Sequence, residues 1–505
     1  MEIPKSENIL VTPHVQLAKN FSFISLLGLA FATLNSWSAF ASSLPLSLSS
    51  GGPLSIIWGL LAAGICTLCI SISLAEILSA YPTAAGQYQW VAVSWDEYKE
   101  VLAWFTAWFN VAAWICLPAT ASLFGSSLIM NIAVLANPNL TVQPWQVFLV
   151  YIGFCLTGFL INAFWNSILA ALSKAALIWS LCGFLIFSIT ALACAVPDYN
   201  SATYVFTQFI NETGWPDGVA WPLGLLQGSL CLIGFDAVAH MIEEIPNPSV
   251  QGPRVMVACV AIGALTSFAF IIVLLFVSDD INTIITSGYG PLLQIILDAT
   301  KSKAGAICLL LFPIICLLMG IVAIMTTSSR MILALGRDSG MPFSPFWTRV
   351  HPTLGTPLNA LGLTAFLTLC CGCIYLGSST AFNALSSATV VCFDISYGFP
   401  IIIHCLRGRN QLPKSHWTLS PVIGWTVNLV AIGYILLTTV LFLFPPSLPV
   451  TGRSMNYGVV VIGIVLIIST AYWLVRGRKR FSRQHVLSAE EDTTTVTDST
   501  HIAVK

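Results

Sequence analysis

Charged residues are scarce in this sequence: Asp, Glu, Lys and Arg together make up 8 % of 505 residues, whereas soluble domains carry roughly 25 %. So few charges cannot cover a water-exposed surface, which excludes a soluble multidomain enzyme with polar linkers. The formal net charge of -1 excludes the basic face that nucleic-acid binding requires. Hydrophobic residues make up 56 % instead. The composition indicates a polytopic membrane protein.

The sequence also lacks the residue clusters that catalysis or metal binding would require. Nearly all of its 15 cysteines lie within apolar runs, where free Cys packs as a small hydrophobe. Six of its seven histidines lie near the termini or at loop edges, which leaves His240 alone among the apolar segments. Nucleophile–base pairs and His/carboxylate clusters therefore have no candidates. We expect no enzymatic activity, no cofactor and no metal.

Long apolar runs dominate the chain, and about 20 mainly apolar residues are enough for one spanning helix. The runs are apolar all round, as expected where lipid and other helices surround each segment. The sequence therefore predicts an all-α membrane protein with 12 transmembrane helices within 21–476, flanked by an N-terminal segment, 1–20, and a disordered tail, 477–505. The 12 runs cover roughly 21–44, 54–78, 102–131, 146–165, 174–196, 221–243, 255–278, 304–328, 357–377, 382–405, 419–445 and 456–476.

The distribution of basic residues assigns the loops to the two sides of the membrane. Twelve spans place both termini on one side, and the loops of the opposite side hold only Lys301, Lys303 and Arg453. Cytoplasmic loops carry the excess of Lys and Arg, so we expect cytoplasmic termini. The expected location is the plasma membrane. The glycosylation sequons at Asn139 and Asn211 fall in predicted outside loops, which agrees with this orientation.

Two apolar segments contain polar or backbone-breaking residues where a bilayer makes them costly, and such positions indicate functional sites. In the first segment these are Thr33, Asn35, Ser36 and Ser38, and in the sixth they are Gly234, Asp236 and His240. Interrupted helices at matching positions of two halves point to a transporter binding site. Their separation by five spans predicts inverted repeats at about 21–196 and 221–405, with two helices at about 419–476 appended.

Several motifs, in order along the chain, are similar to those of one transporter family. They are Ser73-Leu-Ala-Glu-Ile-Leu-Ser-Ala-Tyr-Pro-Thr-Ala-Ala-Gly-Gln-Tyr-Gln-Trp90, Gly234-Phe-Asp-Ala-Val-Ala-His-Met-Ile-Glu-Glu-Ile-Pro-Asn-Pro248, Arg337-Asp-Ser-Gly-Met-Pro342 and Tyr375-Leu-Gly-Ser-Ser-Thr-Ala-Phe-Asn383. They resemble the fungal amino acid/choline transporter branch (4-aminobutyrate/choline permease-like) of the amino acid–polyamine–organocation superfamily, although Ala85 stands where the family usually has Gly. The resemblance implies uptake of amino acids, 4-aminobutyrate, choline or related amines. It also implies an inverted-repeat fold with helices 1 and 6 broken around the substrate.

The candidate substrate-binding residues lie at the two expected breaks: Asn35, Ser36 and Trp37 on the first, and, by the resemblance, Ile233, Gly234, Phe235 and Asp236 on the sixth. Free N–H groups and the positive end of a half-helix favour a carboxylate there. Asp236 could neutralise an ammonium group, bind a proton or cap a broken helix, and the faces of Trp37 and Phe235 could contact a cation. Ordinary interhelical hydrogen bonding and packing is the alternative. The third span holds Trp104, Trp108, Asn110 and Trp114, and one of these is a further candidate to line the cavity, although Trp104 fits an interfacial belt equally.

A second set of candidates concerns coupling and gating. His240 can titrate near neutral pH, or it can be a satisfied buried histidine. Glu243 and Glu244 end the sixth helix, where carboxylates oppose the helix dipole and require basic partners, with Arg254, Arg330 and Arg337 as candidates. These ion pairs form either a gate that breaks during transport or a static solvated cluster. Glu76, at the end of the second helix, has the same two interpretations.

These features predict a secondary active transporter that imports an amino acid or a small amine such as 4-aminobutyrate. Alternating access with proton symport is the expected mechanism, with sodium as the alternative coupling ion. A choline or quaternary amine transporter of the same fold is the alternative function. A transporter-like nutrient sensor is a third candidate, but sensors usually carry a long cytoplasmic extension, and this tail is short.

Overall fold

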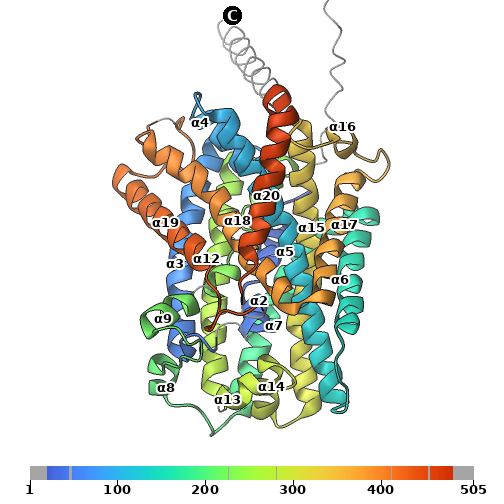
Figure 1. The fold of residues 1–505 in the computed structure, drawn as a ribbon, viewed down its shortest axis with the longest axis vertical. Coiled ribbons are helices and arrows are strands. Elements are labelled where there is room, and N and C mark those ends of the chain that lie inside the picture. The colour runs from blue at the N-terminus through green and yellow to red at the C-terminus, as the bar shows by residue number, and fades with distance from the viewer. Residues whose placement is uncertain are drawn as a thin grey trace, which may run out of the picture.

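The secondary structure of the described residues is helical, apart from an isolated bridge between Ser50 and Asn211. The computed structural model describes residues 20–44, 48–225, 227–279, 281–410, 412–452 and 455–481. The predicted terminal segments, 1–20 and 477–505, therefore lie mostly outside the described residues. Most of the long helices run lengthwise or obliquely through one bundle (Figure 1). The predicted all-α class is confirmed, and the last spanning segment, Gly458–Phe481, extends beyond the predicted boundary at 476.

Within the described ranges, 11 helices are long and apolar enough to cross a membrane. The first consists of α1 (Phe23–Leu34) and α2 (Ser36–Ser43). The others are α3 (Gly52–Ala80), α5 (Lys99–Ala136), α6 (Pro144–Phe164), α7 (Leu169–Cys194), α12 (Pro248–Val277), α15 (Lys303–Arg337), α17 (Leu358–Gly377), α18 (Ser379–Leu406), α19 (Pro421–Leu441) and α20 (Gly458–Tyr472).

The predicted span over 221–243 is divided among three short helices, which accounts for the difference between 12 predicted spans and 11 observed ones. These helices are α9 (Asp217–Leu225), α10 (Gln227–Leu230) and α11 (Ala237–His240). Residues 231–236, between α10 and α11, have no helical assignment. The chain therefore changes from helix to irregular backbone and back again inside one apolar segment.

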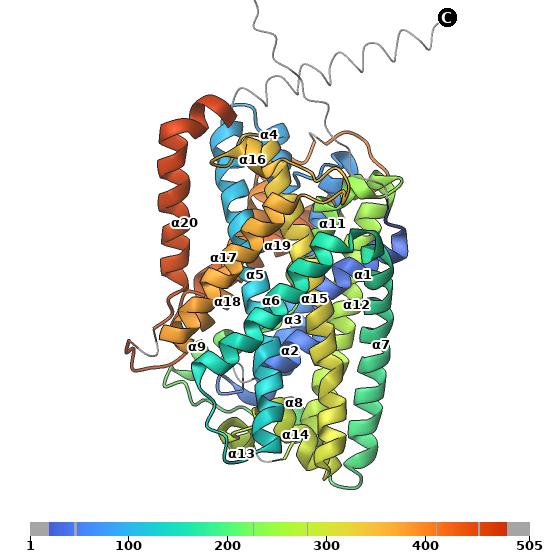
Figure 2. The same ribbon diagram turned by 90° about the vertical axis from the view of Figure 1, so that its right-hand side faces the viewer.

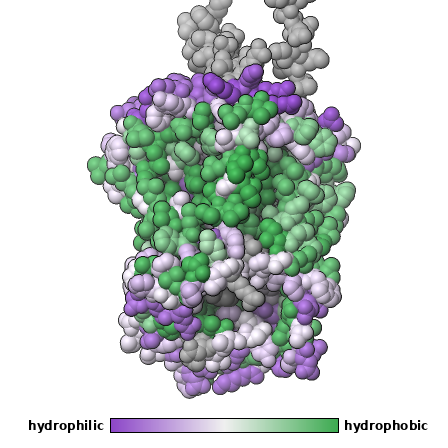
Figure 3. Space-filling model, in the orientation of Figure 1, coloured by the Kyte–Doolittle hydropathy of each residue, from purple (hydrophilic) through white to green (hydrophobic). Residues whose placement is uncertain are grey.

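The molecule has two polar ends separated by an apolar belt, which Figure 3 shows. The end that we call the basic end carries α4 (Gln87–Ser94), α16 (Ser344–Trp347) and Arg337, where α15 finishes (Figures 1 and 2). The opposite end, called the sequon end, carries α8 (Ala202–Thr207), α13 (Ile281–Thr286) and α14 (Pro291–Thr300). An apolar belt of this kind fits the hydrocarbon layer of a bilayer.

The α1–α2 segment is the most enclosed of the spanning segments, whereas α20 is the most exposed. Helix α1 contacts α7, α12 and α15, the helices beside it in Figure 2. A glycine permits the contact with α7, because a Cβ atom on Gly28 would lie 2.1 Å from the carbonyl oxygen of Ser173. Close packing of this kind leaves no space for an added methyl group.

We expect Gly28→Ala to destabilise the fold, because the new methyl group must push α1 away from the α7 backbone. Overpacking of a close contact typically lowers the free energy of unfolding by about 1–3 kcal/mol. The control is Gly153→Ala on α6, where a Cβ atom would have no neighbour within 4 Å. Thermal unfolding of the detergent-solubilised variants measures the difference. A Gly28→Ala protein as stable as Gly153→Ala would contradict the proposed contact.

Candidate functional site

The first spanning segment is interrupted at Asn35, which joins α1 to α2. Asn35 adopts the left-handed conformation, with φ of 53°. Its N–H still donates to the carbonyl of Phe31 at 3.0 Å, and its own carbonyl accepts from the N–H of Ala39 at 2.7 Å. The N–H groups of Ser36, Trp37 and Ser38 open α2, and in the described part of the chain they have no backbone acceptor in α1.

The sixth segment is interrupted over a longer stretch that includes Gly234. This glycine has φ of 85°, a conformation that side-chain-bearing residues rarely adopt. Its N–H donates to the hydroxyl of Tyr397 on α18 at 3.2 Å. A Cβ atom here would lie 3.1 Å from the side chain of Thr33 on α1, so the two interrupted segments face each other at this level. The structure thus places the predicted residues Ile233, Gly234, Phe235 and Asp236 between α10 and α11.

Asp236 is fully buried and its carboxylate is surrounded by hydrogen-bond donors. The Tyr397 hydroxyl donates to Oδ1 at 2.7 Å. Oδ2 accepts from Nε2 of Gln87 at 2.8 Å, Nδ2 of Asn110 at 3.1 Å and Nε1 of Trp114 at 3.3 Å. These donors belong to α4, α5 and α18, so one carboxylate connects three helices to the interruption. Because each donor stabilises the ionised form, the site can hold a negative charge away from water.

His240 completes the group of side chains around Asp236. Its Nδ1 is 2.9 Å from the carbonyl oxygen of Ala84, which can only accept, so Nδ1 carries a hydrogen. Its Nε2 is 3.3 Å from Oδ2 of Asp236. At this distance Nε2 and Oδ2 form a buried histidine–carboxylate contact, which is an ion pair when the imidazole is protonated.

Aromatic rings enclose the Asp236 carboxylate. Phe235 and Tyr397 have ring centroids 4.8 Å apart, and Phe393 lies 5.4 Å from both Tyr397 and Trp114. All four rings are buried. Such a cluster excludes water, which strengthens electrostatic interactions within it. It also offers π faces to a cation.

The structure does not bring Trp37 into this aromatic cluster. Its indole N–H donates to the hydroxyl of Ser180 on α7 at 2.9 Å. Its ring contacts Phe270 of α12 at 4.9 Å, and Phe187 of α7 at 6.2 Å. Trp37 therefore packs α2 against α7 and α12, which is the packing role weighed for it from the sequence.

Two other predicted residues of the first segment keep polar atoms unpaired. Nδ2 of Asn35 and Oγ of Ser36 are buried and have no hydrogen-bond partner among the described residues. Glycines face both: Gly320 of α15 lies against Asn35, and Gly263 of α12 lies against Ser36. Buried polar groups are normally satisfied, so these two atoms are available to a bound solute or water.

The basic end is closed by ion pairs between the sixth segment and α15. Glu244 and Arg330 are both buried, with Oε1 3.1 Å from Nε. Glu243 and Arg337 form a more exposed pair at 3.2 Å. The predicted acidic residues thus meet two of the three arginines considered. Arg254, the third, is exposed and forms no ion pair within the described ranges.

Glu76, near the C-terminal end of α3, lies apart from these two ion pairs and belongs to a separate cluster. Its Oε2 accepts from Nη2 of Arg409 at 2.7 Å, and its Oε1 accepts from the N–H of Leu419 at 2.9 Å. Arg409 also donates to the carbonyl of Gly424 on α19. These contacts tie α3 to the connection between α18 and α19, so Glu76 fits the static interpretation better than the gating one.

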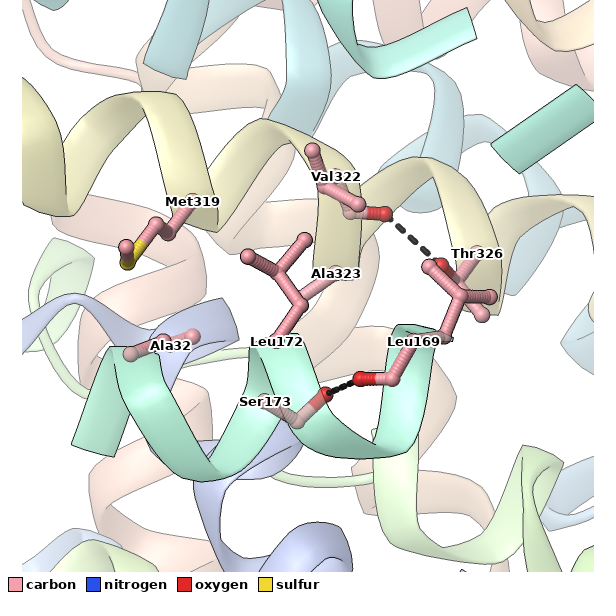
Figure 4. A pocket seen from close by; sticks show the side chains of 9 residues that line it. Ala32, Leu169, Leu172, Ser173, Met319, Val322, Ala323 and Thr326 are labelled. Carbon is pink, nitrogen blue, oxygen red and sulfur yellow. Dashed lines mark hydrogen bonds between the residues drawn. The ribbon is translucent and has the colours of Figure 1, made fainter. Parts of the chain in front are cut away.

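Cavities lie at both ends of the described bundle and between them, and one of about 130 Å³ at the basic end is lined by Glu76 and Arg409. At the sequon end a cavity of about 240 Å³ is lined by α2, α5 and the start of α14, including Ser42, Phe124, Ser127, Asn131 and Gly290. Figure 4 shows a much smaller pocket of about 10 Å³ among α1, α7 and α15, where the hydroxyls of Ser173 and Thr326 donate to carbonyls of their own helices. The smaller space suits one water-sized species and not an organic solute.

Comparison with known proteins gives consistent matches over nearly the whole chain. A family model described as amino acid permease matches residues 21–467. The chain is 34 % identical over 486 residues to a choline transporter of Saccharomyces cerevisiae, covering 95 % of this chain and 84 % of the relative. It is 28 % identical over 490 residues to an amino-acid permease of Arabidopsis thaliana, covering 92 % and 93 %. A Neurospora crassa amino-acid permease is 29 % identical over 467 residues, covering 88 % and 85 %.

We expect Arg330→Ala to destabilise the closed basic end of the protein far more than Arg337→Ala does. Removing Arg330 leaves the buried Glu244 carboxylate without its cation, which typically costs about 3–5 kcal/mol. Removing Arg337 breaks a partly exposed pair worth about 1 kcal/mol or less. Thermal unfolding in detergent compares the two variants. The double variant Arg330→Met/Glu244→Leu should recover most of the loss, and equal effects of the two single variants would refute the assignment.

Proposed function

The chain belongs to the amino acid permease family and is a transporter rather than an enzyme, and from this premise we propose that it is a proton-coupled importer of an amino acid or a small amine such as 4-aminobutyrate. The observation that carries this proposal is the buried Asp236–His240 pair in the interruption of the sixth segment. A membrane-embedded pair that holds one proton, beside unpaired backbone and side-chain groups, supplies both a proton site and a solute site.

The two interruptions supply complementary groups for a zwitterionic solute. At the start of α2, the N–H groups of Ser36 and Trp37 and the unpaired Nδ2 of Asn35 would donate to a carboxylate. The faces of Phe235 and Tyr397 would receive the amine. Asp236 would attract the amine through its electrostatic field and not through a direct hydrogen bond, because its oxygens already take part in five hydrogen bonds.

Choline is the second candidate substrate. The aromatic cluster of Trp114, Phe235, Phe393 and Tyr397 is favourable to a quaternary ammonium group, which cannot donate hydrogen bonds. The match to the choline transporter of Saccharomyces cerevisiae over 95 % of the chain also supports this alternative. Choline has no carboxylate, so it would leave the N–H groups at the start of α2 unused.

The proposed transport cycle alternates access between the two ends. The buried Glu244–Arg330 pair closes the basic end, while a cavity adjoins α2 at the sequon end. This asymmetry supports a conformation that receives solute from the sequon end. Opening the basic end would then require the two pairs between the sixth segment and α15 to break. The excess of basic residues orients the basic end toward the cytoplasm. In the plasma membrane, movement of the solute from the sequon end to the basic end is then import.

Uptake assays in cells that lack their own carriers test the function and the coupling. We expect accumulation of labelled 4-aminobutyrate or an amino acid to rise as external pH falls and to collapse with a protonophore. A membrane potential provides about 2.3 kcal/mol per charge per 100 mV, or roughly 50-fold accumulation. His240→Gln and Asp236→Asn should lose this accumulation, since neither variant can hold the proton of the pair.

The control variant is Asp96→Asn, an exposed acid whose side chain is 93 % accessible, and it should transport as the unmodified protein does. Competition by unlabelled choline, 4-aminobutyrate and amino acids ranks the substrates. Choline competing alone would replace the first candidate substrate with the second. Wild-type accumulation that ignores both pH and protonophore, or full accumulation by Asp236→Asn, would refute proton coupling at this site.

A further inference from the structure

A second carboxyl group lies within the apolar part of the bundle, and the site described above does not use it. Asp394 is in the middle of α18 and only 4 % exposed. Its Oδ2 lies 2.6 Å from the Thr438 hydroxyl of α19. Within the described ranges it has no other hydrogen bond and no ion pair. An ionisable residue at such a position indicates a functional role.

The surroundings of Asp394 contrast with those of Asp236. Asp236 contacts five hydrogen-bonding side chains, and one of them is the imidazole of His240. Asp394 has a single hydroxyl beside it, which cannot replace the hydration of a carboxylate. An isolated buried charge is so costly that the group becomes neutral instead. The neutral form of Asp394 is the protonated acid.

The hydrogen bonding of Thr438 leads to the same result. Its Oγ1 lies 2.9 Å from the carbonyl oxygen of Tyr434, one turn earlier on α19. A helical Thr hydroxyl commonly donates to the carbonyl four residues before it. The same hydroxyl donates to Oδ2 of Asp394 at 2.6 Å, so its single hydrogen is shared between a backbone carbonyl and the carboxyl group. A shared donor of this kind stabilises a carboxylate charge poorly.

Asp394 lies where α18, α19 and the sixth segment meet. Tyr397, three residues further along α18, donates to Asp236 and accepts from the N–H of Gly234. On α19 the hydroxyl of Tyr434 is 2.5 Å from that of Ser229 on α10. The contact between Asp394 and Thr438 therefore joins α19, which holds α10, to α18, which holds the interruption of the sixth segment.

Among the described residues, the titratable groups that interact with Asp394 carry no positive charge. Tyr434 of α19 and Tyr397 of α18 interact with it electrostatically, and Asp236 lies beyond Tyr397. Cys392 is on its own helix, and Cys66 of α3 lies near Tyr434. Neither a phenol nor a thiol can neutralise a carboxylate. Deprotonation of Asp394 therefore requires water to reach the contact between α18 and α19.

We propose that Asp394 is a second proton-binding site of the transporter, which holds a proton in the conformation described here and releases it to water when α18 and α19 separate. This inference rests on the proposed proton-coupled function. In the release step the carboxyl O–H bond breaks, the proton passes to water, and the carboxylate keeps the electron pair. Protonation then favours the closed contact between α18 and α19, and deprotonation favours the open one.

Infrared difference spectroscopy of the purified protein tests the protonation without any transport measurement. A protonated carboxyl group has a C=O stretching band distinct from the carboxylate bands, and the band shifts in heavy water. We expect the band at neutral pH in the unmodified protein and in Asp236→Asn, and its loss in Asp394→Asn. Absence of the band from the unmodified protein, or its persistence in Asp394→Asn, would overturn the proposal.

The number of protons moved per solute tests whether the bound proton is exchanged. Asp394→Asn resembles the protonated acid, since its amide is neutral and its oxygen can still accept from Thr438, so we expect it to fold and to transport with one proton fewer per solute. The matched control is Asp298→Asn, an acid at the sequon end whose carboxylate bonds Gln294. An unchanged proton ratio in Asp394→Asn would overturn the exchange. A wild-type carrier with no proton coupling would instead refute the proposed function, while the infrared band would still report on Asp394.

Discussion

A charge inside an apolar helix bundle must be surrounded by hydrogen-bond donors, and the Asp236 carboxylate imposes this requirement on the rest of the protein. All of its partners are side chains, and four of the five lie on other helices. The irregular stretch from Cys231 to Asp236 frees the N–H of Gly234, which binds Tyr397, and Tyr397 in turn binds Asp236. The interruption, the network and the buried charge are therefore parts of one solution to a solvation problem.

The position of His240 follows from the same requirement. Four neutral donors can orient a carboxylate but cannot cancel its charge, whereas His240, with Nε2 3.3 Å from Oδ2, does both when it is protonated. The carbonyl of Ala84 orients the ring by accepting from Nδ1, so only Nε2 can exchange a proton with the carboxylate. A solute that carries its own positive charge into this cluster would compete with that proton, which is a physical basis for linking solute to proton.

The sequence predicts the interruptions well, because a polar residue or a glycine in an apolar run is visible in one dimension, as at Asn35 and Gly234. It also predicts basic partners for the acidic end of the sixth segment. The donors Gln87 and Tyr397 were not predicted, since they lie 149 and 161 residues from Asp236 and meet it only through packing. The direction of a ring such as Trp37 likewise depends on its neighbours. Asp394, however, also interrupts an apolar run, so the rule that singles out Asp236 could have found it.

The helix α4 connects the proton site to the closure of the basic end. Gln87, its first residue, donates to Asp236, and the next residue, Tyr88, donates to Asp338 just beyond α15 at 2.8 Å. The sixth segment makes a parallel connection, since only α11 separates Asp236 from the pair of Glu244 with Arg330. Loss of the Asp236 charge would weaken the hold on Gln87, and movement of α4 would then disturb the contact with Asp338. Two short elements, rather than one long helix, thus link protonation in the interior to the ion pairs at the basic end.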